Sequence, residues 1–210
     1  MNFGILLHGG ADSNKRRRTR KRAYNKQEEE EILKTIEQAA CSGFDVLNHD
    51  YNPIINRGKN NNACAAVDAV ELAVAIMEDS GVFNAGIIGS CLTSDGAMEM
   101  DASIMNGKDL SAGCVGMVQN IQNPIKLARF VMERTDHVML VSDGVIQLAK
   151  LFDIEIKYRR PTELNLKKYS SYMKDNNYNK RMIKKEWPKN HKLLFSSLTK
   201  FKFSLNITEQ

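Results

Sequence analysis

The chain lacks a hydrophobic run long enough to cross a membrane, and its first seven residues carry no basic flank and no extended apolar stretch. The first absence excludes a transmembrane helix, and the second argues against a secretory signal. The four cysteines lie far apart and form no Cys-x-x-Cys pair, which disfavours a zinc site or a disulfide framework. Unpaired cysteines fit a reducing compartment, so we expect a cytoplasmic protein that does not bind membranes.

Glycine is missing from the last third of the chain. All 13 glycines lie at or before Gly144. Charge divides nearby, because residues 1–150 carry 16 basic and 19 acidic side chains, whereas residues 151–210 carry 14 basic and 6 acidic ones. The last part is rich in Lys and Asn with few apolar residues, a composition that buries little surface. We therefore predict a folded part at residues 1–156 and an extra basic, poorly ordered and mobile tail at residues 157–210.

Hydrophobic periodicity in the first part predicts both helices and strands. Apolar residues recur at helical spacing, and Asn123-Pro124 offers an N-cap residue followed by a first-turn proline. Short apolar runs predict strands, and Ser94-Asp95-Gly96 predicts a hairpin turn. The predicted helices are 25–47, 63–77, one opening at 123–124, and 143–151, and the predicted strands are 2–7, 91–93, 97–105, 112–118 and 137–141. Antiparallel strands with helices packed outside them indicate a layered α/β or α+β domain.

Two glycine-containing segments offer chemistry as well as structure. In Phe83-Asn84-Ala85-Gly86, the Asn84 amide either bonds its own backbone in a turn or donates a hydrogen bond to a developing oxyanion. The His8-Gly9-Gly10 segment either ends a strand or allows the backbone to approach a substrate closely. The residue types alone leave both pairs of alternatives open.

Charged residues form two further groups. Glu99, Asp101 and Ser103 share one face of a predicted strand, where carboxylates can act as acid and base but more often form a hydrated surface. The run from Lys15 to Lys26 holds eight basic residues in twelve and can bind phosphates. It is more often a solvated helix face, and the acidic residues that follow favour local pairing. Interleaved aromatic residues and recognised modules are missing, so we expect no nucleic-acid partner.

Three contiguous motifs resemble those of the plant-type L-asparaginase/isoaspartyl peptidase family. They are Phe-Asn-Ala-Gly at 83–86, the run from Leu-Thr-Ser-Asp-Gly to Leu-Ser-Ala-Gly at 92–113, and Asn-Pro-Ile-Lys-Leu-Ala-Arg at 123–129. The segments His8-Gly9-Gly10-Ala11 and Ala66-Val67-Asp68-Ala69-Val70-Glu71 match the opening segments of the family. The resemblance covers roughly residues 1–156 and identifies them with the α half of that family.

This resemblance implies an N-terminal nucleophile hydrolase with an αββα sandwich, here incomplete, that hydrolyses L-asparagine or β-aspartyl dipeptides. A threonine freed by self-cleavage is the nucleophile, and its own α-amine is the base. The match places Asn84 in the oxyanion hole. It also implies a structural sodium ion, and no other cofactor, on backbone carbonyls, the oxygen ligands that hard cations prefer. The matching positions are Met77, Glu78, Ser80, Phe83, Ala85 and Ile87.

The chain departs from the family pattern in three places, the first of which is a longer loop at residues 50–62 in place of a tight glycine turn. Ile87 and Ile88 stand where the family has one residue before Gly-Ser, and the Gly-Thr-Val-Gly-Ala-Val-Ala-Leu-Asp motif of the nucleophile is absent. Thr199 matches the nucleophile position weakly, with Leu198 in place of the preceding glycine. We therefore expect the chain alone to be inactive. The alternative is a non-catalytic truncated relative that pairs with itself or with a full-length relative through an exposed apolar sheet face.

Overall fold

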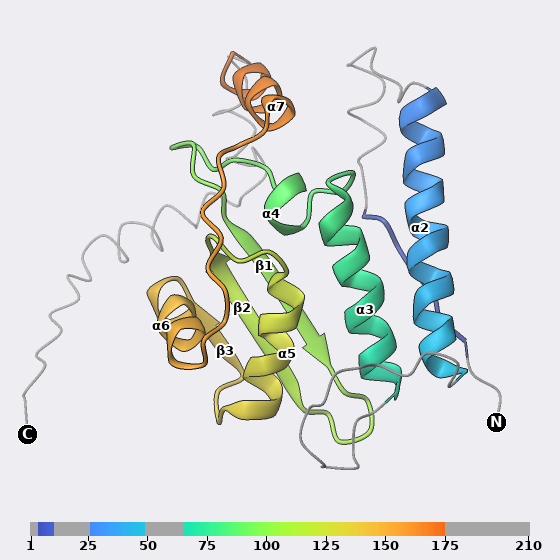
Figure 1. Ribbon diagram of the computed structural model, residues 1–210. Helices are drawn as coiled ribbons and strands as arrows, with labels where there is room; N and C mark the ends of the chain where they lie inside the picture. The colour runs from blue at the N-terminus through green and yellow to red at the C-terminus, as the bar shows by residue number, and fades with distance from the viewer. Residues whose placement is uncertain (1–3, 11–25, 49–64, 175–210) are drawn as a thin grey trace, which may run out of the picture. The chain divides into compact units, whose positions relative to one another are not determined.

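The structure is a computed structural model that describes residues 4–10, 26–48 and 65–174. The chain divides into two compact units, residues 1–169 and 170–210, and of the second unit only residues 170–174 are described. Figure 1 shows a small sheet with helices beside it in the first unit. No helix in the described part of the chain is long and apolar enough to cross a membrane.

The described elements agree closely with the periodicity of the sequence. The four predicted helices are present, one of them with the same bounds, and the central strands are confirmed over most of their length. The elements are α2 (Lys26–Leu47), α3 (Ala65–Ser80), α4 (Gly86–Gly89), β1 (Met100–Met105), β2 (Ala112–Val118), α5 (Pro124–Arg134), β3 (Met139–Val141), α6 (Asp143–Leu151) and α7 (Glu163–Met173). Helix α7, which spans the boundary between the two units, was not predicted.

Helices α2 and α3 pack closely because their contact residues are small. Helix α2 buries Ala39, Gly43 and Val46. A Cβ at Gly43 would lie 3.0 Å from the carbonyl oxygen of Ala69 in α3 and 2.5 Å from Cδ1 of Ile5. A side chain at this position would therefore separate the two helices and displace Ile5.

The sheet has three strands in the order β1-β2-β3, with β1 antiparallel and β3 parallel to β2. A parallel pair needs a crossover connection, and helix α5 supplies it between β2 and β3. The predicted hairpin is present in reduced form. Leu92 and Met98 make a single antiparallel bridge, and Gly96 takes a φ of +86° in the turn.

A bulge interrupts the pairing of β1 with β2. The register shifts between Met100 and Ala102, and the Asp101 carboxylate accepts a hydrogen bond from the Met117 N–H at 2.9 Å. The predicted alternation in β1 is confirmed, because Asp101 and Ser103 are exposed whereas Met100 and Ile104 are buried. Asp101 thus satisfies the backbone of the bulge on the exposed face.

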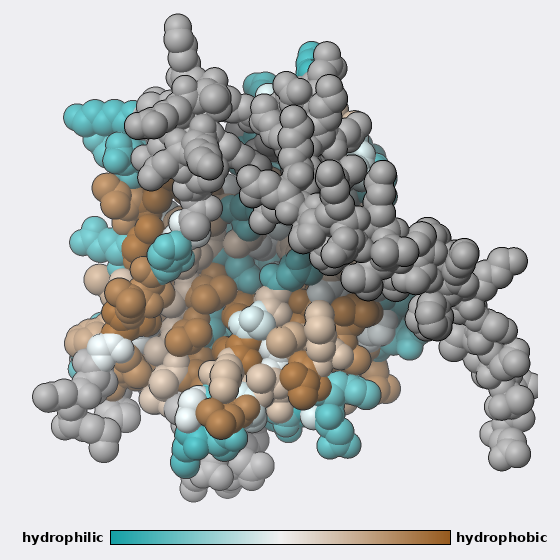
Figure 2. Space-filling model, turned by 180° about the vertical axis from the view of Figure 1, so that it is seen from behind, coloured by the Kyte–Doolittle hydropathy of each residue, from teal (hydrophilic) through white to brown (hydrophobic). Residues whose placement is uncertain are grey.

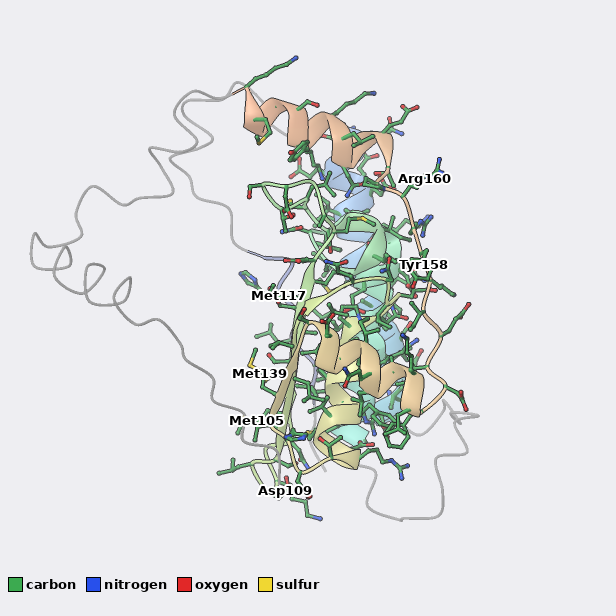
Figure 3. All side chains as sticks on the ribbon, turned by 90° about the vertical axis from the view of Figure 1, so that its left-hand side faces the viewer. Met105, Asp109, Met117, Met139, Tyr158 and Arg160 are labelled. Atoms are coloured by element: carbon green, nitrogen blue, oxygen red, sulfur yellow. The ribbon has the colours of Figure 1, made fainter. Side chains whose placement is uncertain are left out.

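The two faces of the sheet differ. Helices cover one face, where Val115, Val118, Leu127, Val131 and Val145 are almost completely buried. The other face, which we name the open face, carries about half-exposed apolar side chains, and Figure 3 shows its methionines on the side of the sheet opposite the helices. Figure 2 shows hydrophobic residues gathered on this side of the molecule. The apolar residues of the open face are Met105, Met117, Met139 and Val141.

The predicted strand at residues 2–7 is wrong where it can be checked. Residues 4–7 have no regular secondary structure, and Leu6 is 95% exposed. A strand needs a neighbouring backbone, and the described parts of the chain offer residues 4–7 no strand partner. This segment instead runs alongside α2, with Ile5 against Gly43 and Gly9 near Ile36.

Asn123 occupies the predicted N-cap position of α5, but its side chain does not make the hydrogen bond expected of an N-cap residue. The side chain instead donates to the Asp79 carboxylate at 2.9 Å. Oε1 of Glu78 accepts from the Ile125 N–H at 3.1 Å in its place. Two acidic side chains from the end of α3 therefore hold the start of α5.

Candidate active site

A compact loop connects α3 to the bridge at Leu92, and glycines allow its turns. Gly81 and Gly86 have φ values of +70° and +64°, a region that favours glycine. A Cβ at Gly89 would collide with the carbonyl oxygen of Phe83. Both the N–H and the hydroxyl of Ser90 donate to the Gly86 carbonyl, at 3.2 and 2.7 Å. The loop is therefore closed by its own backbone.

Asn84 lies on the outer side of this loop with a defined orientation. Its side chain is exposed, and its Oδ1 accepts a hydrogen bond from the Cys91 N–H at 2.7 Å. Because only the oxygen of an amide accepts hydrogen bonds, this contact directs Nδ2 to the other side. A fixed amide donor of this kind can stabilise negative charge on a substrate oxygen.

The buried carboxylate of Glu78 lies behind the same loop. The residue is 3% exposed, and its Oε2 has no hydrogen-bond partner within the described residues. Burial raises the pKa of Glu78 to about 7, although the hydrogen bond from the Ile125 N–H acts in the opposite direction. A neutral carboxyl is thus favoured in the folded protein below that pH.

The six predicted sodium ligands lie on the end of α3 and on this loop. The Met77 carbonyl accepts from the Ser80 hydroxyl at 2.7 Å. The Glu78 carbonyl lies 2.5 Å from the position that a Cβ would take at Gly86, and the Phe83 carbonyl faces Gly89. Ala85 is extended, and Ile87 is buried. The described residues contain no group of three His, Cys, Asp or Glu side chains that could hold a metal. A sodium ion here would use backbone carbonyl oxygens, the kind of ligand that hard cations accept.

A second set of charges joins the first part of α3 to α5. Arg129, which is 3% exposed, contacts Asp68 and Glu71 at 2.5 Å and Glu133 at 2.6 Å. Burial alone lowers the pKa of Arg129, but its hydrogen bonds to Glu133 and Asp68 outweigh that effect and raise it. The guanidinium therefore stays charged and holds the two helices together.

Helix α7 contacts the loop from a distant part of the sequence. The side-chain amide of Asn165 donates to the Ser90 carbonyl at 2.6 Å, and the Tyr169 hydroxyl donates to the Ser94 carbonyl at 3.0 Å. Asn165 was not among the predicted site residues. The pattern Thr162-x-x-Asn165 resembles a capping box and could have indicated where the helix starts, but not its partner.

The glycine-rich N-terminal segment lies against the loop. A Cβ at Gly9 would lie 2.9 Å from the ring of Phe83, next to Asn84. His8 accepts a hydrogen bond from the Gly10 N–H at 3.1 Å, as a turn residue does. The structure thus brings together two segments that the sequence analysis selected separately. Thr199 and residues 15–25 of the basic run lie outside the described residues, and Lys26 pairs with Glu30 at 3.7 Å on the surface.

Comparisons with known proteins agree with these motifs. The asparaginase family profile matches residues 1–197, and the chain belongs to this family. It is 40% identical over 173 residues to a plant-type L-asparaginase of Thermococcus kodakarensis, which covers 81% of this chain and 47% of that protein. It is 43% identical over 149 residues to an isoaspartyl peptidase/L-asparaginase of Bos taurus, and this alignment covers 71% of this chain and 41% of that protein. The chain therefore spans about half the length of the curated relatives that it matches.

Proposed function

We propose that this chain is the α half of an amidohydrolase that acts on L-asparagine and β-aspartyl dipeptides. The observation that carries the proposal is the orientation of the exposed Asn84 side chain, whose Oδ1 is held by the Cys91 N–H so that Nδ2 is turned away from Cys91. The names of the relatives, L-asparaginase and isoaspartyl peptidase, support the substrate class. The small-molecule substrate would lie against the exposed side of Asn84.

The proposed chemistry is acyl transfer to a threonine. The threonine hydroxyl adds to the side-chain carbonyl of the substrate and gives its proton to the threonine α-amine. Asn84 donates through Nδ2 to the carbonyl oxygen as it becomes negative, a contact of a kind worth roughly 10²- to 10³-fold in rate. The adduct then expels ammonia, or the amino group of the dipeptide, which takes up the proton. Water hydrolyses the resulting ester to release aspartate and restore the hydroxyl.

A sodium ion would support this chemistry structurally. When bound by the carbonyls of the end of α3 and the following loop, it would stiffen the segment that carries Asn84. The positive φ values of Gly81 and Gly86, which turn this segment back on itself, support this proposal. The proposed ligands are Met77, Glu78, Ser80, Phe83, Ala85 and Ile87.

We expect the 210-residue chain alone to be inactive, because Thr199 follows Leu198 where the family has glycine. A β-carbon there restricts the strained backbone that self-cleavage uses. The purified chain should remain one band on a denaturing gel and release neither ammonia from asparagine nor aspartate from β-aspartyl dipeptides. A second band from cleavage before residue 199, abolished together with hydrolysis by Thr199→Ala, would show instead that Thr199 is a working nucleophile.

The second candidate function is that of a non-catalytic partner of a full-length relative. The open face favours it, since Met105, Met117, Met139 and Val141 expose a contiguous apolar surface. In the proposed αββα sandwich, a second sheet would cover this face. Mixing the chain with a full-length relative should give a complex in light-scattering measurements that Met139→Lys weakens. If the chain forms a homodimer and no complex with the relative, self-association is favoured instead.

We also propose a cellular location and a domain boundary for this chain. The wide spacing of the cysteines supports a cytoplasmic location, and the three described cysteines are free thiols. The change in composition supports a division of the chain near residue 156. The first part of the predicted mobile tail nevertheless forms α7 (Glu163–Met173), whose Asn165 is buried and bonds Ser90, so the proposed mobile tail begins after this helix. Limited proteolysis of the purified chain would test it, with the first cuts expected in the Lys-rich tail.

A further inference from the structure

Helix α7 begins with reciprocal hydrogen bonds that fix Asn165. The Thr162 hydroxyl accepts from the Asn165 N–H at 3.2 Å, and Oδ1 of Asn165 accepts from the Thr162 N–H at 3.2 Å. The Thr162 hydroxyl also bonds Oδ1 of Asn165. This is a capping-box arrangement with Asn in the position that Glu or Gln usually takes. The oxygen end of the Asn165 amide is therefore committed to the start of its own helix.

The nitrogen end of the same amide faces the active-site loop. Asn165 is 5% exposed, and its Nδ2 donates to the carbonyl oxygen of Ser90 at 2.6 Å. The helix start thus holds one end of the amide, and the loop receives the other. A buried amide satisfied at both ends has a single favourable orientation.

One peptide group links this bond to Asn84. In a trans peptide the carbonyl of Ser90 and the N–H of Cys91 point in opposite directions in one plane. The Ser90 carbonyl accepts from Asn165, and the Cys91 N–H donates to Oδ1 of Asn84 at 2.7 Å. A hydrogen bond at one end of a peptide group polarises it and strengthens the bond at the other end. The order Asn165, Ser90–Cys91 peptide, Asn84 is therefore a continuous hydrogen-bond chain.

We propose that Asn165 is a positioning residue that orients the Asn84 amide through the Ser90–Cys91 peptide. The inference rests on the proposed function, because it assigns Asn84 the role of oxyanion donor. It adds a residue 81 positions further along the chain, on a helix for which the described residues show no hydrogen bond to Asn84 itself. Through this bond, the start of α7 determines whether the Asn84 donor points outward.

Tyr169 provides a matched comparison. It lies on the same helix and bonds the hairpin turn that directly follows the loop, since its hydroxyl donates to the Ser94 carbonyl at 3.0 Å. Its bond does not involve the peptide that holds Asn84. A general tethering of the loop by α7 would make the two bonds equivalent, whereas the positioning role belongs to Asn165 alone.

The test compares Asn165→Asp with Tyr169→Phe in the full 210-residue chain by nuclear magnetic resonance. Asn165→Asp keeps an oxygen for the Thr162 N–H but removes the donor to Ser90. We expect exchange of the Cys91 N–H to become about tenfold faster and the Asn84 side-chain amide signals to move, as expected for a weakened hydrogen bond. Tyr169→Phe should leave both unchanged. Equal effects of the two variants, or no effect of Asn165→Asp, would overturn the proposal.

A measurement on the unaltered chain keeps the proposal testable if Asn165→Asp does not fold. Couplings across hydrogen bonds should join Asn165 Nδ2 to the Ser90 carbonyl carbon and the Cys91 nitrogen to Cγ of Asn84, and absence of the second coupling contradicts the proposal. Addition of L-aspartate separates the two roles. Intact couplings with no response of the Asn84 signals to aspartate would support positioning by Asn165 while removing the catalytic role from Asn84.

Discussion

The two faces of the sheet are built from the same strands but differ in how they are covered. On the helix-covered face, Val115 and Val118 meet Leu127 and Val131 of α5, and all four are nearly inaccessible to solvent. On the open face, Met117 and the neighbouring apolar residues remain about half exposed. The first face is complete within this chain, and the second is not covered by any described residue.

The side chains of the two faces are suited to different tasks. Branched aliphatic residues have few rotamers and pack into one arrangement, as they do under α5. Methionine is flexible and adapts to varied surfaces, and it is often used where partners bind. Met105, Met117 and Met139 therefore suit the partner-binding role proposed above for the open face, whereas the covered face fixes the fold.

The largest effect should come from the charges that join the helices on the covered side. Arg129→Met removes the buried cation shared by Asp68 and Glu71. Breaking a buried ion pair by removing one partner typically lowers the free energy of unfolding by about 4 kcal/mol. Urea denaturation measures the change. Lys26→Met, which breaks only the exposed pair with Glu30, is the control and should change it by less than about 0.5 kcal/mol.

The comparison of the faces is tested directly by truncating one side chain on each. Leu127→Ala should lower the free energy of unfolding by about 3.5 kcal/mol, because it leaves a cavity under the sheet. Met139→Ala on the open face should cost less than about 1 kcal/mol in the isolated chain. Similar losses for both variants would mean that the open face is already covered, for example by self-association.

A pH dependence should reveal the carboxyl buried on the covered side. The pKa of Glu78 is raised from 4.5 to about 7, so the folded state favours the neutral form. The stability that the neutral Glu78 contributes is therefore fully present below about pH 4.5 and is lost as the pH rises through 7. The free energy of unfolding should fall by about 3 kcal/mol over this range. Glu78→Gln should not show this decline. Parallel unfolding curves of the two proteins from pH 4 to pH 8 would contradict the assignment.

The smallest of the expected effects tests the close approach of α5 to β2. A Cβ at Gly113 would fall on the Ala128 carbonyl and lie 2.6 Å from the Met132 nitrogen. Gly113→Ala should therefore lower the free energy of unfolding by about 2 kcal/mol through overpacking. Gly107→Ala has no atom within 4 Å of the added carbon, and thermal unfolding should show almost no change.

The elements with a clear internal period could be predicted from the sequence. Helix α6 matches the predicted residues 143–151, and the alternation of β1 is confirmed. The strand at 2–7 could not be judged locally, because strand formation depends on a partner that the described chain does not provide. Helix α7 has few apolar residues, and its start depends on the bonds between Thr162 and Asn165 rather than on periodicity.

The site was predictable where it is contiguous in sequence. The Phe83-Asn84-Ala85-Gly86 motif located the loop, and the positions of its glycines explain its turns. The partners that come from elsewhere were not predictable, since Asn165 bonds Ser90 across 75 positions and carries no signal of its own. The same is true of Glu78, which takes the capping role at α5 that the local pattern assigned to Asn123.

Helix α5 follows β2 and precedes β3 in the sequence, and this order has a consequence for how the chain folds. Strand β2, helix α5 and strand β3 occupy residues 112–141, so their contacts close short loops. The bonds from Asn165 to Ser90 and from Tyr169 to Ser94 each span 75 positions and close much longer loops. Because short loops close at a lower entropic cost, we expect residues 112–141 to collapse first and α7 to dock last. The orientation of Asn84 is then one of the final properties that the folding chain acquires.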